Sequence, residues 1–111
     1  MQERIDAIID VLDRNKAKDI EIFNLKEKDY IVDYAVIATS LGQKHTPALL
    51  DYLKLDLKPR GETFAQVDDE SDDWIVIDLG DIMIHIMTEK YREKYHLDEF
   101  MEEIKERKIN S

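Results

Sequence analysis

The sequence predicts an α+β fold, in which one mixed β-sheet of about five strands forms a single domain with the helices that pack on it. Three observations lead to this prediction. Apolar residues recur at helical spacing near both ends of the chain, strand-like runs lie between these ends, and one more helical segment separates the first two strands from the rest. The order helix, two strands, helix, three strands, helix is typical of helices packed on a mixed sheet.

The first three elements are expected in the first forty residues. The segment ERIDAIIDVLDRNKAKD has an apolar stripe at the i, i+3, i+4, i+7 positions of an amphipathic helix, made of Ile5, Ile8, Ile9 and Leu12. DIEIFNL at 19–25 alternates like a half-buried strand, whereas DYAVIAT at 33–39 is apolar on both faces, as a central strand would be. The charged KEKD between the two strands is predicted to be a turn.

The second helix is expected in ALLDYLKLDL. Thr46 is a plausible N-cap, and Pro47 is the residue best tolerated at the first helical position. A start a few residues earlier, with Pro47 in the first turn, is the alternative, and the helix should end by Pro59 or Gly61. A short strand in ETFAQV and a solvated acidic loop at 68–73 should follow.

The run DWIVIDLGDIMIHIM, residues 73–87, predicts a β-hairpin, because Gly80 followed by Asp81 is typical of a two-residue type II′ turn. With this turn, one face of the hairpin would be aliphatic and buried, with Leu79 opposite Ile82, Ile77 opposite Ile84 and Ile75 opposite Ile86. The other face would carry Trp74, Val76, Asp78, Met83, His85 and Met87. After the hairpin, the chain should close with one helix whose apolar stripe is Leu97, Phe100, Met101 and Ile104.

The mixed face of the hairpin has two interpretations. It could be a second buried layer, with Trp74 under a helix and His85 hydrogen-bonded to a carbonyl or to Asp78. Alternatively it could bind a partner, because a tryptophan with flexible methionines and a few carboxylates is the mixture found at the centres of interfaces. Residue types alone leave both interpretations open.

Composition excludes several classes of protein. The 111 residues should form one domain, 1–111, and they contain no cysteine, which excludes disulfides and thiolate chemistry. The chain has 26 acidic and 16 basic residues, and the resulting net charge of −10 disfavours direct binding to nucleic acid. The charged N-terminus is unlike a signal peptide, and the apolar runs are too short to span a bilayer, so we expect a cytoplasmic protein that does not contact membranes.

The sequence contains no recognisable catalytic or metal-binding pattern. His45, His85 and His96 lack the spacing of a metal site, and GxSxG, P-loop and GxGxxG motifs are absent. Asp78 and Asp81 are separated by the predicted turn, so they should not project in parallel as a metal-binding Asp-x-Asp pair does. We therefore expect no catalytic residue, no metal, no cofactor and no enzymatic activity.

The hairpin resembles the signature strand pair of the ribosomal silencing factor family, RsfS, also called Iojap-like. The family pattern is similar to Trp-x-x-x-Asp-x-Gly-Asp-x-x-x-His, matched here by Trp74, Asp78, Gly80, Asp81 and His85. DIEIFNL resembles the first strand of the family. DYAVIATSLGQKH resembles its Asp-Tyr-x-Val-Ile-Ala-Thr segment, which is followed by a basic residue and His. EKYREKYHLDEF resembles its Glu-x-x-Arg-x-x-Tyr-x-Leu-Glu ending. In the last segment Asp98 stands for the usual Glu.

The resemblance implies a fold similar to that of nucleotidyltransferases, without the paired catalytic carboxylates. It also implies binding to the large ribosomal subunit, through the basic ribosomal protein numbered fourteen at the intersubunit face, which blocks joining of the small subunit and represses translation. On this basis Trp74 should present the partner surface together with Asp73, Asp78 and Asp81. Lys44 and His45, at the expected helix start, are weaker candidates for contacts.

Two other functions are kept as alternatives. A small nucleotidyltransferase-like enzyme would need two carboxylates within about 5 Å of each other at a cleft, around a shared metal. A homodimer in the free state could pair the Trp74 faces of two copies and make that patch structural. His85 is assigned to the fold in either case.

Overall fold

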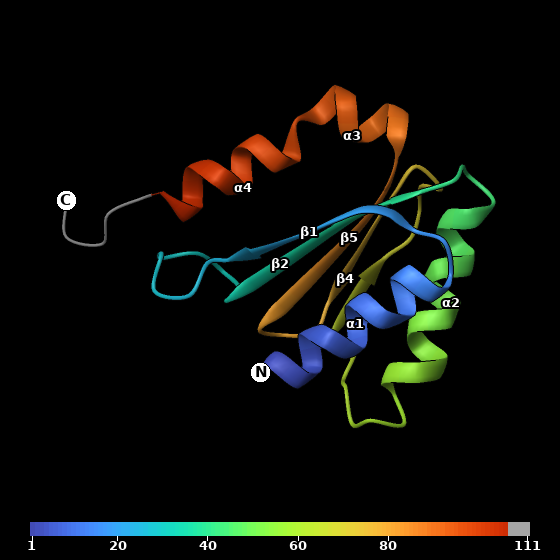
Figure 1. The fold of residues 1–111 in the computed structure, drawn as a ribbon, viewed down its shortest axis with the longest axis horizontal. Coiled ribbons are helices and arrows are strands. Elements are labelled where there is room, and N and C mark those ends of the chain that lie inside the picture. Colours follow the sequence, from blue (N-terminus) through green and yellow to red (C-terminus); the bar gives the residue numbers. More distant parts are fainter. Residues whose placement is uncertain (107–111) are drawn as a thin grey trace.

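The computed structural model describes residues 1–106, which form four helices and five strands (Figure 1). The helices are α1 (Gln2–Arg14), α2 (His45–Leu57), α3 (Glu89–Tyr95) and α4 (Leu97–Lys105). The strands are β1 (Lys18–Asn24), β2 (Tyr34–Ser40), β3 (Gln66–Asp68), β4 (Trp74–Asp78) and β5 (Ile82–Thr88). The predicted α+β class is therefore confirmed.

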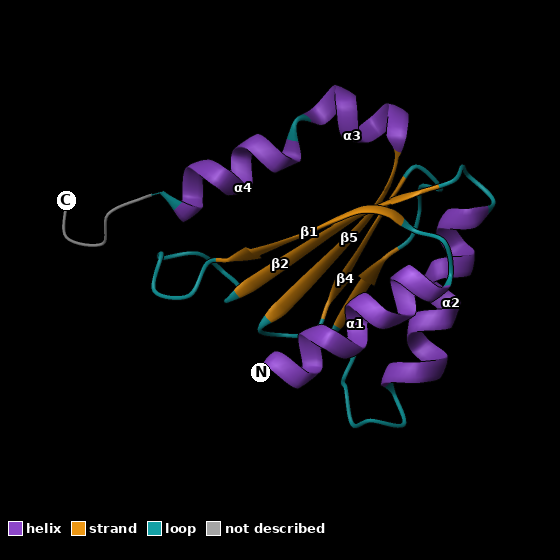
Figure 2. Ribbon diagram, in the orientation of Figure 1, coloured by secondary structure: helices purple, strands orange, loops and turns teal. Residues whose placement is uncertain are grey.

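The strands form one sheet in the order β1-β2-β5-β4-β3, with β2 and β5 parallel and the other neighbours antiparallel. This is the mixed sheet of five strands that the sequence predicts. Figure 2 shows α1 and α2 on one face of the sheet and α3 and α4 on the other. The helices that follow the two parallel strands thus lie on opposite faces.

The larger core lies between the sheet and the pair α1 and α2. The aliphatic face of the β4–β5 hairpin is buried there, and Ile75 pairs with Ile86 and Ile77 with Ile84, as the predicted turn requires. The stripe of α1 contributes Ile5, Ile8 and Leu12. The hairpin register and the first helix are both confirmed.

A smaller core lies on the other face, where α4 packs over β1 and α3 packs beside β5 and β2. Strand β2 is buried on both faces, because Val36 and Ala38 join the larger core while Ala35 and Ile37 join the smaller one. The prediction of a central strand is confirmed. The helices leave part of this face open over β4, where Val76 is only half-buried, as is Met83 on β5.

The C-terminal prediction of one continuous helix is wrong. His96 has a left-handed backbone (φ 50°) and separates α3 from α4. Leu97, Met101 and Ile104 are buried as predicted, but Phe100 is 43% exposed and meets Tyr30 edge-on, with 6.3 Å between ring centroids. After the break, α4 packs on β1 through Leu97, Met101 and Ile104, and Phe100 lies at the edge of this buried stripe.

Two boundaries also differ from the first expectation. Helix α2 starts at His45, so the alternative with Pro47 in the first turn is the correct one, and the Thr46 hydroxyl donates to the carbonyl of Gly42 instead of capping the helix. The strand expected in ETFAQV starts only at Gln66, where the register with β4 begins, although the N–H of Ala65 still donates to the carbonyl of Asp78 at 2.8 Å. Within residues 1–106, none of the helices is both long enough and apolar enough to cross a membrane.

Candidate partner-binding site

The hairpin turn is built as the Gly-Asp pair predicts. Gly80 has φ +99°, a region that favours glycine, and its N–H donates to Asp78 Oδ1 at 2.7 Å. The N–H of Leu79 donates to the carbonyl of Ile82 at 2.9 Å and closes the turn. The Asp78 carboxylate therefore stabilises the turn, and it also lies on the open surface of the sheet.

Asp81 lies on the α1 side of the turn, where Arg4 binds it. Two Arg4 nitrogens donate to the Asp81 carboxylate at 2.7 and 2.9 Å, and the same guanidinium donates to Glu62 at 2.7 and 2.9 Å. The hydrogen bonds from Arg4 hold the pKa of Asp81 below its usual range. Sequence reasoning missed this contact, because Arg4 lies 77 residues before Asp81 and no short-range pattern connects them.

Trp74 begins β4 and is half-buried at the edge of the smaller core. Its ring centroid lies 5.4 Å from that of Tyr95 on α3 and 6.0 Å from that of His85 on β5. The indole N–H donates to Nδ1 of His85 at 3.1 Å. The tryptophan therefore has one side packed on the fold and one side toward solvent.

His85 serves the fold, as predicted, although its hydrogen-bond partner is Trp74 and not a carbonyl or Asp78. The side chain is 5% exposed, and burial lowers the pKa of the imidazole to about 4, because the charged form is poorly solvated there. Since Nδ1 accepts from Trp74, the proton of the neutral ring lies on Nε2. Among the buried side-chain nitrogen and oxygen atoms of residues 1–106, this Nε2 is the one that lacks a hydrogen-bond partner.

Asp73 connects three segments next to Trp74. Its Oδ1 accepts a hydrogen bond from the Thr88 hydroxyl at 3.1 Å, and its carbonyl accepts from the Thr88 N–H at 2.9 Å. Its Oδ2 accepts from the Gln43 side chain at 3.1 Å. The start of β4 is thus held to the end of β5 and to the loop that precedes α2.

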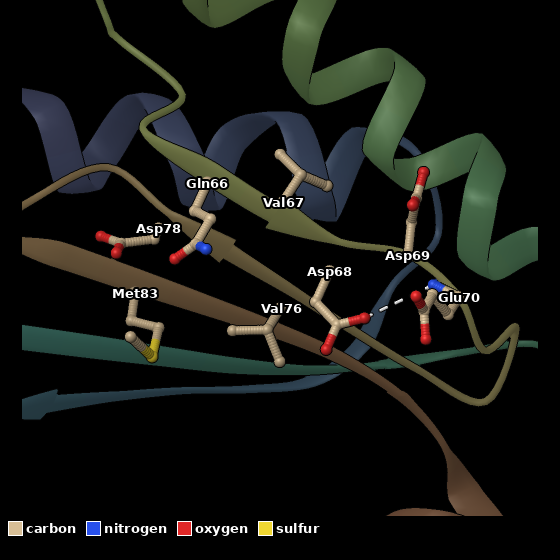
Figure 3. A pocket seen from close by; sticks show the side chains of 8 residues that line it. All are labelled: Gln66, Val67, Asp68, Asp69, Glu70, Val76, Asp78 and Met83. Carbon is tan, nitrogen blue, oxygen red and sulfur yellow. Dashed lines mark hydrogen bonds between the residues drawn. The ribbon is translucent and has the colours of Figure 1, made fainter.

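The open part of the sheet contains a hollow of about 520 Å³. Figure 3 shows Val76 and Met83 beside each other on the sheet surface, with Gln66, Asp68 and Asp78 next to them. The hollow is lined by Gln66, Val67, Asp68, Asp69, Glu70, Val76, Asp78 and Met83. Its centre is apolar and four of its residues are acidic, so its charge suits a basic partner. The sequence predicted the shared face of Val76, Asp78 and Met83 and an acidic loop at 68–73, but not that the loop lies beside this face.

His45 and Lys44 lie where α2 begins. Nδ1 of His45 accepts from the N–H of Leu41 at 2.9 Å, so its Nε2 donates to the carbonyl of Asn15, 2.7 Å away. These two hydrogen bonds connect the start of α2 to the end of α1, so His45 has a structural role. Lys44 is exposed and follows Gln43, the residue that binds Asp73.

The predicted site residues consequently fall into separate places. Asp73 and Trp74 are together at the start of β4, and Asp78 is at the end of the same strand, beside the hollow. Asp81 is around the turn with Arg4, on the side of α1. Within residues 1–106, no three acidic or histidine side chains are placed to hold a metal ion.

Trp74 lies on the same face of β4 as Val76 and Asp78, which line the hollow. A half-buried tryptophan on one surface with an apolar patch and several carboxylates is typical of a protein that acts by binding. Comparison with known proteins agrees with this class. The chain matches, over residues 1–111, the family described as ribosomal silencing factor during starvation, and it belongs to that family.

Two relatives and one solved structure illustrate the match. The ribosomal silencing factor RsfS of Haemophilus influenzae is 35% identical over 95 residues, which are 85% of this chain and 93% of the relative. The mouse protein named mitochondrial assembly of ribosomal large subunit protein 1 is 31% identical over 85% of this chain and 43% of its own length. A crystal structure of a Chromobacterium violaceum protein superposes with a TM-score of 0.85 at 24% identity, covering 91% of this chain and 85% of that one, which shows the shared fold.

Proposed function

We propose that the protein silences translation in the cytoplasm by binding the large ribosomal subunit and preventing the small subunit from joining it. Membership in the silencing factor family supports a role in ribosome silencing. The observation that supports the mode of action is the open, acidic face of the sheet beside Trp74, which is suited to a protein partner. Occlusion of a surface needs no catalytic group and no cofactor.

The partner on the ribosome is proposed to be a basic protein, the large-subunit ribosomal protein numbered fourteen, as the family resemblance implies. The net charge of −10 opposes contact with bare RNA but attracts a basic protein surface. Within the proposed surface, Trp74 supplies most of the affinity, while acidic residues at the hollow increase the association rate. Asp73 and Asp78 belong to this surface, and Asp81, Lys44 and His45 are its more distant members.

A nucleotidyltransferase-like enzyme is the less favoured alternative. The Arg4 guanidinium binds both Glu62 and Asp81, so a cationic group already bridges the two carboxylates that a shared metal would have to bridge. Asp78 accepts a hydrogen bond from the hairpin turn. These contacts favour structural tasks for the three carboxylates over a catalytic one.

A homodimer is the other alternative, with two Trp74 faces buried against each other. Mass measurement in solution, with and without the ribosomal partner, separates the two cases. A dimer that persists on the ribosome would mean that the Trp74 face is not the ribosome-binding surface, whereas a monomer on the ribosome supports the proposal.

The proposed function is tested by sedimentation of purified subunits with the protein. We expect the protein to travel with large subunits and to reduce the fraction of joined ribosomes when small subunits are added. A variant with the acidic loop neutralised (Asp68→Asn, Asp69→Asn, Glu70→Gln) should associate about tenfold more slowly at low salt, because steering is lost. The matched control neutralises three exposed acids of α4 (Glu99→Gln, Glu102→Gln, Glu103→Gln) and should associate like the parent.

Two results would contradict the proposal. One is sedimentation with neither subunit or with small subunits alone. The other is normal joining of subunits while the large ones are saturated with protein, which would separate binding from silencing.

A further inference from the structure

A second hollow lies at the carboxyl ends of the two parallel strands, and it shares no lining residue with the first. Strands β2 and β5 are parallel neighbours, and their carboxyl ends lie side by side at Ser40 and Thr88. The chain continues from β2 into α2 on one face and from β5 into α3 on the other (Figure 1). Adjacent parallel strands whose helices go to opposite faces leave a crevice at their carboxyl ends, which is where open α/β sheets bind small ligands.

The crevice has a volume of about 430 Å³, within the range of small-molecule sites, which begins at about 300 Å³. It is lined by Lys18, Asp19, Thr39, Ser40, Leu41, Gly42, Thr88, Glu89 and Lys90. Three chain segments meet there: the start of β1, the end of β2 with its following loop, and the junction of β5 with α3. None of these residues is a member of the partner surface proposed above, although Thr88 binds one of its members, Asp73.

The walls of the crevice are held in place by a side chain from α3. Arg92 donates to the hydroxyl of Thr39 at 2.8 Å and to the carbonyl of Asp19, and it also forms an ion pair with Asp98 at 2.7 Å. Asp19 has φ +48° and lies where the register of β1 is shifted against β2. An irregularity of this kind, fixed from outside, is found more often beside functional sites than elsewhere.

The charges in the crevice define what it could bind. Lys18 and Lys90 both line it, and neither has an ion-pair partner within residues 1–106, although the chain carries a large excess of acid. Asp19 and Glu89 line the same crevice, but neither forms an ion pair with these lysines, so both ammonium groups are available to bind a phosphate group. The carboxylates of Asp19 and Glu89 can accept hydrogen bonds from hydroxyl groups, which a sugar attached to the phosphate would supply.

We propose that the crevice between the carboxyl ends of β2 and β5 binds a phosphorylated, hydroxyl-bearing small molecule of the nucleotide or sugar phosphate class, with its phosphate at Lys18 and Lys90. The ligand does not need a glycine-rich loop, because the lysines and the strand ends provide the contacts. This proposal is independent of the ribosomal partner, and each can fail without the other.

The test is a titration of the isotope-labelled chain by two-dimensional NMR with three probes: adenosine diphosphate, ribose 5-phosphate and adenosine. We expect both phosphorylated probes to shift the amide signals of Ser40, Leu41, Gly42 and Thr88, and adenosine to leave them unchanged. The variant Lys18→Ala with Lys90→Ala should bind about tenfold or more weakly, because two charge-assisted contacts are lost.

A matched control replaces two exposed lysines that do not line the crevice, Lys26→Ala with Lys105→Ala. It changes the net charge by the same amount and should bind like the parent. The proposal is overturned if neither phosphorylated probe shifts these signals, if adenosine shifts them equally, or if both double variants lose affinity to the same extent. If ribose 5-phosphate is sufficient, the sugar phosphate is the recognised group; if only the nucleotide binds, the base contributes as well.

Discussion

Lowering the pH from 7 to 5 should destabilise the protein through His85. In the folded chain the pKa of this buried imidazole is lowered to about 4, whereas in the unfolded chain it has the ordinary value of 6.5. Between these two values the unfolded state binds a proton that the folded state does not. The stabilising effect of the neutral ring is therefore complete above pH 6.5, is lost as the pH falls toward 4, and changes no further below that.

The magnitude follows from the two pKa values. One pKa unit corresponds to about 1.4 kcal/mol, so the complete effect is about 3.4 kcal/mol, of which about 2 kcal/mol is lost between pH 7 and pH 5. For a chain of this size the melting temperature should fall by about 8 °C. The lowered pKa of Asp81 acts in the same direction, but only at pH values near and below 3.8, so it does not contribute in this range.

The measurement is the free energy of unfolding by urea at both pH values, for the parent chain and for His85→Gln. Glutamine retains an acceptor for the Trp74 indole but does not titrate, and it leaves His45 and His96 in place. We expect the parent to lose about 2 kcal/mol more than the variant between pH 7 and pH 5. Equal losses in the two proteins would refute the assignment of this pH dependence to His85.

Three further predictions concern the hairpin and its contacts. Arg4→Met should destabilise the fold by about 2 kcal/mol, because it leaves the Glu62 side chain, which is only 9% exposed, without a partner. Arg14→Met, at an exposed ion pair, should cost less than about 0.5 kcal/mol. Urea denaturation compares the two variants, and equal effects would contradict the reasoning. Gly80→Val should lower the free energy of unfolding by about 1–2 kcal/mol through backbone strain alone, since a Cβ there meets no neighbour. An unchanged melting temperature would show that the turn tolerates a side chain. Nucleotidyl transfer with Mg²⁺ should not exceed background; activity that disappears in Asp78→Asn would instead show an enzyme.

The sequence was sufficient for those parts of the fold whose interactions are local. The stripe of α1 follows from helical periodicity, and the β4–β5 register follows from the turn at Gly80, because a shift by one residue would expose every buried side chain of the hairpin. The same register predicted that Trp74 and His85 share a face. That they form a hydrogen bond depends on rotamers, which the pattern does not contain.

The remaining features depend on contacts between distant segments. Arg4 reaches Glu62 and Asp81 across 58 and 77 residues, so a carboxylate assigned to the partner surface from sequence is held by α1 in the folded chain. The left-handed residue His96 divides the C-terminal segment into α3, which contacts β5 and β2, and α4, which contacts β1. The part of the sheet at Val76 and Met83 stays open beside them, and the sequence pattern does not contain this arrangement of the two helices.

The central claim is that the Trp74 face binds the large ribosomal subunit, and it is tested most directly by the affinity of Trp74→Ala for purified large subunits. Tyr52→Ala serves as the control, because Tyr52 is an exposed aromatic side chain (44% exposed) on α2, which covers the opposite face of the sheet. Binding is measured at a temperature where circular dichroism shows both variants to be fully folded. We predict that Trp74→Ala binds about thirtyfold more weakly, a loss of about 2 kcal/mol, while Tyr52→Ala binds like the parent. Unchanged affinity of folded Trp74→Ala would contradict the account and leave Trp74 with a purely structural task.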